Sequence, residues 1–152
     1  MILRWLFAAS HLLGLGIGLG AVWARAKALR GTLDREGLRR VFIADTWWGI
    51  AAMVWISTGL VRLLAGLEKG TSYYLQNHFF WGKMALLVII IVLEIPAVRT
   101  LVQWRMVTGK GGQPDTSLAP RYATTSTIQL WLTLAMVLLA TGMARGIGVM
   151  PQ

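Results

Sequence analysis

The sequence predicts an all-α membrane protein, a bundle of four transmembrane helices in up-down-up-down order. Three observations support this fold class. Of the 152 residues, 56% are hydrophobic. Four apolar runs are each long enough to cross a hydrocarbon core of ~30 Å at ~1.5 Å per helical residue. Lysines and arginines gather in the short segments beside these runs, as membrane topology requires. We therefore expect a single integral membrane domain over residues 1–152.

The strong positive charge does not indicate nucleic-acid binding. The chain has 15 Lys and Arg against 6 Asp and Glu, which gives a formal net charge of +9. The cations flank apolar segments and do not alternate with aromatic residues in the manner of a nucleic-acid-binding surface. We therefore expect the lipid bilayer, and no nucleic acid, as the partner. The absence of cysteine excludes disulfides, thiolate metal sites and a thiol nucleophile.

The first predicted helix covers residues 3–24. Its basic start at Arg4 is also typical of a signal peptide, but the apolar run is long for one. Arg25, Lys27 and Arg30 follow the run as the flank of a stop-transfer segment does. We therefore expect a transmembrane helix that is retained in the protein.

The second predicted helix covers residues 41–64 and follows a basic loop. In that loop Asp34 can cap a short helical turn that begins near Arg35. Trp47 and Trp48 lie in the first turns of the helix, and we expect them to anchor it at the membrane–water interface.

The third predicted helix covers residues 72–105, and Thr71 or Ser72 can cap its start. Pro96 lies inside this helix and should kink it or loosen its hydrogen bonding. After a loop rich in glycine and proline, the fourth predicted helix covers residues 124–145.

Four spans place both termini on one side of the membrane, here called side A, and the first and third loops on side B. Side B has ten basic residues: Arg25, Lys27, Arg30, Arg35, Arg39, Arg40, Arg99, Arg105, Lys110 and Arg121. Side A has four: Arg4, Arg62, Lys69 and Arg145. The positive-inside rule then predicts that side B is cytoplasmic. In a bacterial-type inner (cell) membrane, both termini of this multi-pass protein would be periplasmic.

The chain has two histidines, and both are expected near side A. His11 lies six residues after Trp5 and His78 five residues after Tyr73, on helices that run in the same direction. If these aromatic residues mark one interface, the imidazoles differ in depth by only ~1.5 Å. Two imidazoles at one level on neighbouring helices suit a b-type haem. We therefore predict His11 and His78 as metal ligands of haem b, although hydrogen bonds to neighbours or headgroups would also account for them.

Small and basic residues near the histidines fit the same hypothesis. Gly14 and Gly18 share the helix face of His11, and Gly82 follows His78 by four residues, so a flat macrocycle could approach the backbone. Helix packing is the competing interpretation for these glycines. The cations expected toward side A could pair with haem propionates or extend to lipid headgroups. They are Arg62, Lys83 and Arg145.

Charged residues within the apolar segments suggest a second kind of site. A charge in hydrocarbon costs at least ~2.5–3.5 kcal/mol on insertion scales, so Lys83 and Glu94 each require a partner or a function. We predict a buried carboxylate–arginine cluster toward side B. This polar membrane cluster would contain Asp45, Glu94, Arg99 and Arg25. Such a cluster could hold the helices together, or it could form part of a proton path or a substrate site.

Three runs of the sequence carry a family resemblance. They are HLLGLGIGLGAVWARAKALRG, FIADTWWGIAAMVWISTGLVRLLAGLEKGTSYY and NHFFWGKMALLVIIIVLEI. Together they closely resemble a bacterial family of small four-helix predicted membrane proteins of unknown function. The resemblance covers most of the chain and implies four helices and an inner-membrane location, but it implies no activity.

The chain is also distantly similar to the HemJ-type protoporphyrinogen oxidases, which are haem b-binding inner-membrane proteins. The similarity rests on His11 with Gly14, on Lys83 followed by Met84, and on the spacing of Arg99. It implies that His11 is a haem ligand. The chain departs from that family's pattern at Trp81 and Glu94, where the family has histidine, and at Asp45, where it tends to have proline.

These observations lead to one leading hypothesis and two alternatives. The leading hypothesis is an inner-membrane protein that binds b-type haem or porphyrin and has a redox or electron-transfer role, as in a haem-dependent membrane oxidoreductase. The first alternative is a small transporter or channel-like module with a polar path of Lys, Glu, Asp and Arg side chains. The second is a structural or assembly subunit whose glycine-rich helix faces bind partner helices. Such faces are also compatible with a homodimer.

The haem hypothesis predicts a visible absorption spectrum. The purified protein should show a Soret band, and His11→Ala should abolish it because the substitution removes an axial ligand. A colourless protein that takes up no added haem would contradict the hypothesis.

Overall fold

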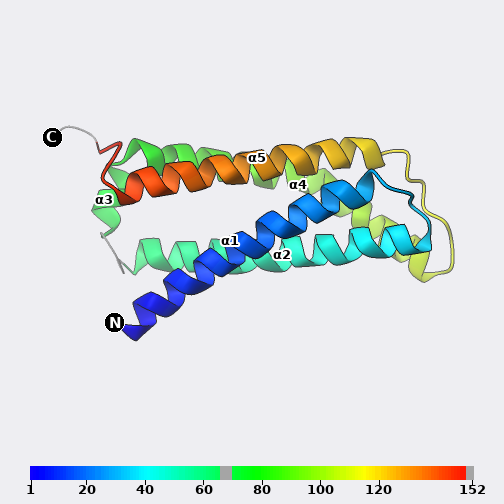
Figure 1. Ribbon diagram of the computed structural model, residues 1–152, viewed down its shortest axis with the longest axis horizontal. Helices are drawn as coiled ribbons and strands as arrows, with labels where there is room; N and C mark the ends of the chain where they lie inside the picture. Colours follow the sequence, from blue (N-terminus) through cyan, green and yellow to red (C-terminus); the bar gives the residue numbers. More distant parts are fainter. Residues whose placement is uncertain (66–69, 150–152) are drawn as a thin grey trace.

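A computed structural model describes residues 1–65 and 70–149 of the chain. Within these ranges there are five α-helices: α1 (Ile2–Leu29), α2 (Arg35–Leu64), α3 (Thr71–Leu75), α4 (His78–Gly109) and α5 (Ala119–Ala144). Among the described residues, α1, α2, α4 and α5 are long and apolar enough to cross a membrane. Figure 1 shows these four helices running along one another, with both termini at the same end. The predicted up-down-up-down bundle of four spanning helices is confirmed.

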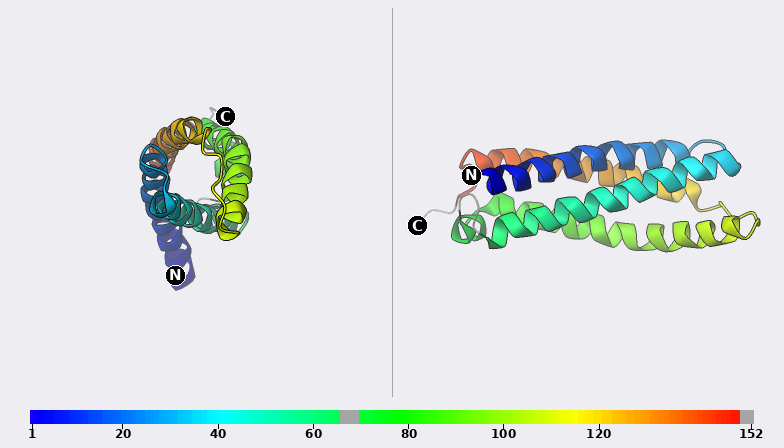
Figure 2. Two further views of the ribbon diagram at one scale, coloured as in Figure 1. Left: turned by 90° about the vertical axis from the view of Figure 1, so that its right-hand side faces the viewer. Right: turned by 90° about the horizontal axis from the view of Figure 1, so that it is seen from below.

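The four long helices are arranged around a common interior. Helix α1 packs against α2 and α5, and α4 packs against α5. The end view in Figure 2 shows that the beginning of α1 projects outside the ring formed by the helices. Ile2, Leu3 and Trp5 are accordingly 74%, 60% and 66% exposed, as suits side chains that contact lipid.

The first two long helices extend further toward side B than the sequence indicated. Helix α1 continues to Leu29, and α2 begins at Arg35 because Asp34 caps it: the Gly37 amide donates to Asp34 Oδ1 at 2.7 Å. The predicted short turn is therefore the first turn of α2 itself. Position 37 also requires glycine, since a Cβ there would lie 1.9 Å from the Thr32 carbonyl oxygen.

The single helix predicted over residues 72–105 is wrong in its first part. The segment forms α3 and α4, separated by Gln76 and Asn77. Asn77 caps α4 by accepting a 2.9 Å hydrogen bond from the Phe79 amide, so neither Thr71 nor Ser72 caps the spanning helix. Helix α4 then runs through Pro96 to Gly109 without interruption.

The interior consists of three apolar clusters along the bundle axis, two of which matter for the candidate site. The middle cluster contains Ala21, Val22, Trp48, Trp55, Ile90 and Met136. The cluster toward side B contains Leu29, Leu38, Val41, Ala97, Leu101, Trp104, Ala119, Tyr122 and Ala123. Trp48 is only 4% exposed, so it is a core residue and not the interface anchor expected from the sequence, whereas Trp47 is 51% exposed. Adjacent helical residues point ~100° apart, which places these two indoles in different surroundings.

The placement of both termini at one end allows a direct test of orientation. Since the chain has no cysteine, single substitutions introduce the only reactive thiol. In intact cells made permeable at the outer membrane, Ser72→Cys should react with a membrane-impermeant maleimide. Gln113→Cys, in the loop between α4 and α5, should react only after the inner membrane is opened, because the positive-inside rule predicts that this loop is cytoplasmic. The reverse labelling pattern would contradict this orientation.

Candidate functional site

The candidate site is centred on Arg25, whose side chain is 1% exposed. All five N–H groups of its guanidinium have an acceptor. Nε donates to Ser126 Oγ at 3.0 Å. Nη1 donates to Asp45 Oδ1 at 2.9 Å and to Glu94 Oε1 at 2.6 Å, and Nη2 donates to Glu94 Oε2 and Gln129 Oε1, both at 2.8 Å. These acceptors come from α2, α4 and α5, so one side chain of α1 contacts every other spanning helix.

Gln129 completes the hydrogen bonding around Glu94. Its Nε2 donates to Glu94 Oε2 at 2.7 Å and to the Ile90 carbonyl at 3.2 Å. Ser126 and Gln129 are three residues apart on α5 and therefore project from the same face of that helix. Both side chains lie at positions that are buried, with exposures of 1% and 0%. The polar groups of Ser126, Gln129 and Glu94 are thus hydrogen-bonded in the interior, as burial requires.

A second arginine extends the site toward side B. Arg105 Nη2 donates to Asp45 Oδ2 and to the Phe42 carbonyl, at 2.8 and 2.7 Å, and Nη1 donates to Thr46 Oγ1 at 3.1 Å. Asp45 therefore lies between two guanidinium groups. The Arg25 Cζ also lies 5.9 Å from the centroid of the Trp48 ring, within the range of a cation–π contact.

We call this set of six side chains the Arg25 network: Arg25, Asp45, Glu94, Arg105, Ser126 and Gln129. It contains two guanidinium groups and two carboxylates, so its formal charges balance. Charge balance and bidentate geometry reduce the cost of placing ions in a low-dielectric interior.

Arg99, which the sequence placed in the polar cluster, lies outside it. Its side chain is exposed and forms no hydrogen bond or ion pair with any residue that the structure describes. At ~100° per residue, Arg99 points about 140° away from Glu94, whereas Arg105, eleven residues after Glu94, returns to within about 20° of the same face. The spacing of eleven residues between Glu94 and Arg105 therefore already indicated, in the sequence alone, that these two side chains share one helix face. Ser126 and Gln129 were also missed, although two polar residues three apart in an apolar helix are a signal of the same kind.

His11 docks on α2. Its Nδ1 lies 3.0 Å from Thr58 Oγ1, and that hydroxyl donates to the Val54 carbonyl at 2.6 Å, so the imidazole is the donor to Thr58. The imidazole ring also lies 6.3 Å from the Trp55 ring, centroid to centroid. Gly59 provides the space, since a Cβ there would be 3.1 Å from His11 Cε1.

His78 has different surroundings from His11. It is the exposed first residue of α4, and its backbone N–H donates to the Gly148 carbonyl at 2.8 Å. His11 instead contacts Thr58 and Trp55 of α2.

The residues expected to surround a haem pack against neighbouring helices instead. A Cβ added at Gly14 would lie 3.2 Å from the Trp55 nitrogen of α2, and one at Gly18 would lie 3.4 Å from the Trp48 ring. At Gly82 it would lie 3.3 Å from Leu139 of α5. Of the candidate propionate partners, Arg62 and Lys83 are half-buried and Arg145 is exposed.

Among the described residues there is no group of three or more His, Asp or Glu side chains suited to a metal ion. Binding of haem b stays a prediction.

The spanning helices and their ion-paired interior define a class, that of multi-pass integral membrane proteins. Residues 3–148 match the family described as "Predicted membrane protein (DUF2214)", and the chain belongs to this family. Comparison with curated proteins gave no match, and comparison with solved structures gave none. The family description agrees with the membrane location and carries no activity.

Substitution of Arg25 tests whether the network holds the bundle together. Arg25→Met should lower the free energy of unfolding by about 3–5 kcal/mol, because two carboxylates would stay in the interior without their shared cation. Thermal or denaturant unfolding of the purified protein in detergent measures this change. Arg99→Met removes an exposed arginine and is the matched control. Equal stability of the two variants would contradict a central role for Arg25.

Proposed function

We propose that this protein is a small membrane transport module in which the Arg25 network, held between the middle apolar cluster and the apolar cluster toward side B, responds to protons. The observation that carries the proposal is the environment of Arg25, a cation within a spanning helix whose N–H groups are all bound by side chains of the other three helices. Ionisable residues inside spanning helices are rare and typically mark ion pathways or proton relays.

The network joins partly exposed side chains through one buried guanidinium group. The Arg105 side chain is 35% exposed and contacts Asp45, which is 13% exposed. Asp45 in turn contacts Arg25, at 1%, and Arg25 contacts Glu94, at 19%. A proton or an anion entering from side B would therefore encounter a continuous series of hydrogen-bonded charged groups.

Protonation of Glu94 would alter the balance of the network. This carboxylate accepts hydrogen bonds from both Nη atoms of Arg25 and from Gln129. With a proton on Glu94, the remaining charges of Arg25, Arg105 and Asp45 sum to one positive charge. An unbalanced charge is costly in a low-dielectric interior, so the bundle would then favour an arrangement that admits water or an anion. Proton binding would in this way be coupled to opening at side B.

Apolar side chains close the interior on both sides of the network. Trp48, Trp55, Ile90 and Met136 of the middle cluster lie toward side A, and the cluster that contains Leu101 lies toward side B. The polar path expected between Lys83 and Glu94 is therefore interrupted in this arrangement. Transport would require the helices to move, as in carriers whose two ends open in turn, rather than a permanent pore.

Holding the helices together does not by itself require charged residues. Apolar side chains of similar volume often hold a buried site as well as an ion pair does, or better, because ion pairs must first lose their hydration. A charged interior is therefore weak evidence for a purely structural role, and it favours a function that uses the charge.

Neutralisation of Glu94 tests the proposal. Glu94→Gln keeps the shape of the side chain and removes its charge, so proton flux should fall to the level of empty liposomes while the protein stays folded. Flux is measured with a pH-sensitive dye inside liposomes, driven by a potassium diffusion potential. Glu36→Gln, which removes an exposed carboxylate on side B, is the matched control and should transport as the wild type does.

Two results would contradict a transport role. The first is a wild-type protein with no flux above that of empty liposomes. The second is unchanged flux in Glu94→Gln, and if the melting temperature fell at the same time, the network would be a structural element of the kind expected in an assembly subunit. The redox role expected from a haem depends on the Soret band described above and stays a separate prediction.

A further inference from the structure

An open groove lies on the outer surface of the bundle between α1 and α2. Its volume is about 800 Å³, within the range of ~300–1,000 Å³ that is typical of ligand sites. Six of its lining residues give the groove its charge and its apolar surface: Gly20, Trp23, Ala24, Lys27, Arg40 and Trp47. The Arg25 network lies in the interior, so this groove is a different site that faces lipid.

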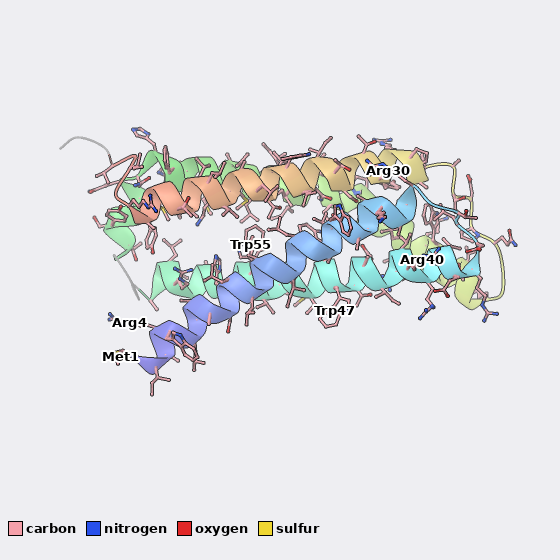
Figure 3. The ribbon with its side chains drawn as sticks, viewed as in Figure 1. Met1, Arg4, Arg30, Arg40, Trp47 and Trp55 are labelled. Carbon is pink, nitrogen blue, oxygen red and sulfur yellow. The ribbon has the colours of Figure 1, made fainter. Side chains whose placement is uncertain are left out.

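The groove is basic at the end toward side B and apolar along the rest of its length. Lys27 and Arg40 are both exposed, and Lys27 Nζ lies 5.2 Å from the centroid of the Trp23 ring. Trp23 and Trp47 are 55% and 51% exposed. Figure 3 shows Trp47 projecting from α2, with Arg40 on the same helix nearer the side B end.

One exposed carboxylate is shared between two arginines next to this basic end. Glu36 accepts two hydrogen bonds from Arg39, at 2.8 and 2.9 Å. It also forms a longer ion pair with Arg40, at 3.9 Å, without a hydrogen bond. Because both side chains of this longer pair are more than half exposed, Arg40 can bind an additional anion together with Lys27.

The apolar part of the groove exists because its floor has little or no side chain. A Cβ added at Gly20 would meet no atom within 4 Å. Along α1 the lining extends from Ile17 to Ala28, about 17 Å at ~1.5 Å per residue. This length exceeds half of the ~30 Å hydrocarbon core, so the groove can hold a chain that spans one leaflet together with part of a headgroup.

We propose that this groove binds one anionic phospholipid, with the phosphate at Lys27 and Arg40 and one acyl chain along α1 past Gly20. The argument is one of complementarity, since an anionic head and an apolar tail match the two ends of the groove. Lysine and arginine at the cytoplasmic surface attract anionic lipids in this way. A second copy of the chain fits less well, because a twofold pairing over the groove would bring the cations of both copies together. The proposal does not depend on the transport function.

Native mass spectrometry of the protein in detergent tests the proposal, with phosphatidylglycerol and phosphatidylcholine as probes. The wild type should retain one phosphatidylglycerol molecule in preference to phosphatidylcholine. Gly20→Leu should greatly reduce retention because the new side chain occupies the groove. Gly16→Leu is the matched control: position 16 is on the same helix and equally open, but it does not line the groove.

The charged end is tested with paired substitutions. Lys27→Gln with Arg40→Gln should weaken phosphatidylglycerol binding on the order of 30-fold, about five- to sixfold for each cation lost. Lys110→Gln with Arg121→Gln removes two exposed cations on the same side of the protein, away from the groove, and should leave retention unchanged. Thermal unfolding of each variant shows whether it is folded. If Gly20→Leu does not fold, the double variant Lys27→Gln/Arg40→Gln provides the test.

Three outcomes would overturn the proposal. One is equal retention of the two phospholipids by the wild type. Another is a loss of binding in the Gly16→Leu or Lys110→Gln/Arg121→Gln controls as large as in the groove variants. The third is a lipid-free dimer that Gly20→Leu dissociates, which would assign the groove to a second copy of the chain.

Discussion

The structure depends on the complete pairing of one buried guanidinium group. Arg25 projects from α1 into the interior, where it would be strongly unfavourable without compensation. Two carboxylates, an amide and a hydroxyl from the other three spanning helices occupy all of its donors. Because arginine is planar and keeps its charge at any relevant pH, the partner side chains have to come to positions that its geometry sets. The arrangement of the four helices at this level is therefore coupled to a single side chain.

The two carboxylates of the network have different surroundings. Asp45 is shared between Arg25 and the partly exposed Arg105, which connects it to the side B surface. Glu94 is held by Arg25 and Gln129 and lies next to the apolar middle cluster. Asp45 therefore has two guanidinium partners, whereas Glu94 has one. This difference is the physical basis for proposing that the proton response belongs to Glu94.

The packing between α1 and α2 serves two purposes at different places. Near His11 and Gly14 the helices approach closely, and the space left by glycine is filled by groups of the neighbouring helix. Further toward side B the open side of α1 at Gly20 leaves a groove between the same two helices. Glycine has thus allowed helix contact at one position and an accessible surface at another, and the difference lies in which side of α1 each residue faces.

Much of the architecture could be predicted from the sequence. Apolar runs and flanking cations are sufficient to predict four spans, because backbone groups in lipid must be paired within helices. The helix ends were less predictable: α2 starts earlier than expected because Asp34 caps it, and α4 starts later because Asn77 does. The need of Glu94 for a partner also followed from the sequence, since the cost of a charge in hydrocarbon does not depend on the fold.

The sequence by itself thus determined the membrane class, the number of spans and the presence of charges that require compensation. Only the tertiary structure decided which groups compensate one another, and it selected Arg105 over Arg99, added Ser126 and Gln129, and placed His11 against α2. The physical reason is that insertion into lipid depends on properties summed along one segment, whereas pairing depends on the rotation and neighbours of each helix. Those are fixed only when all four helices pack together.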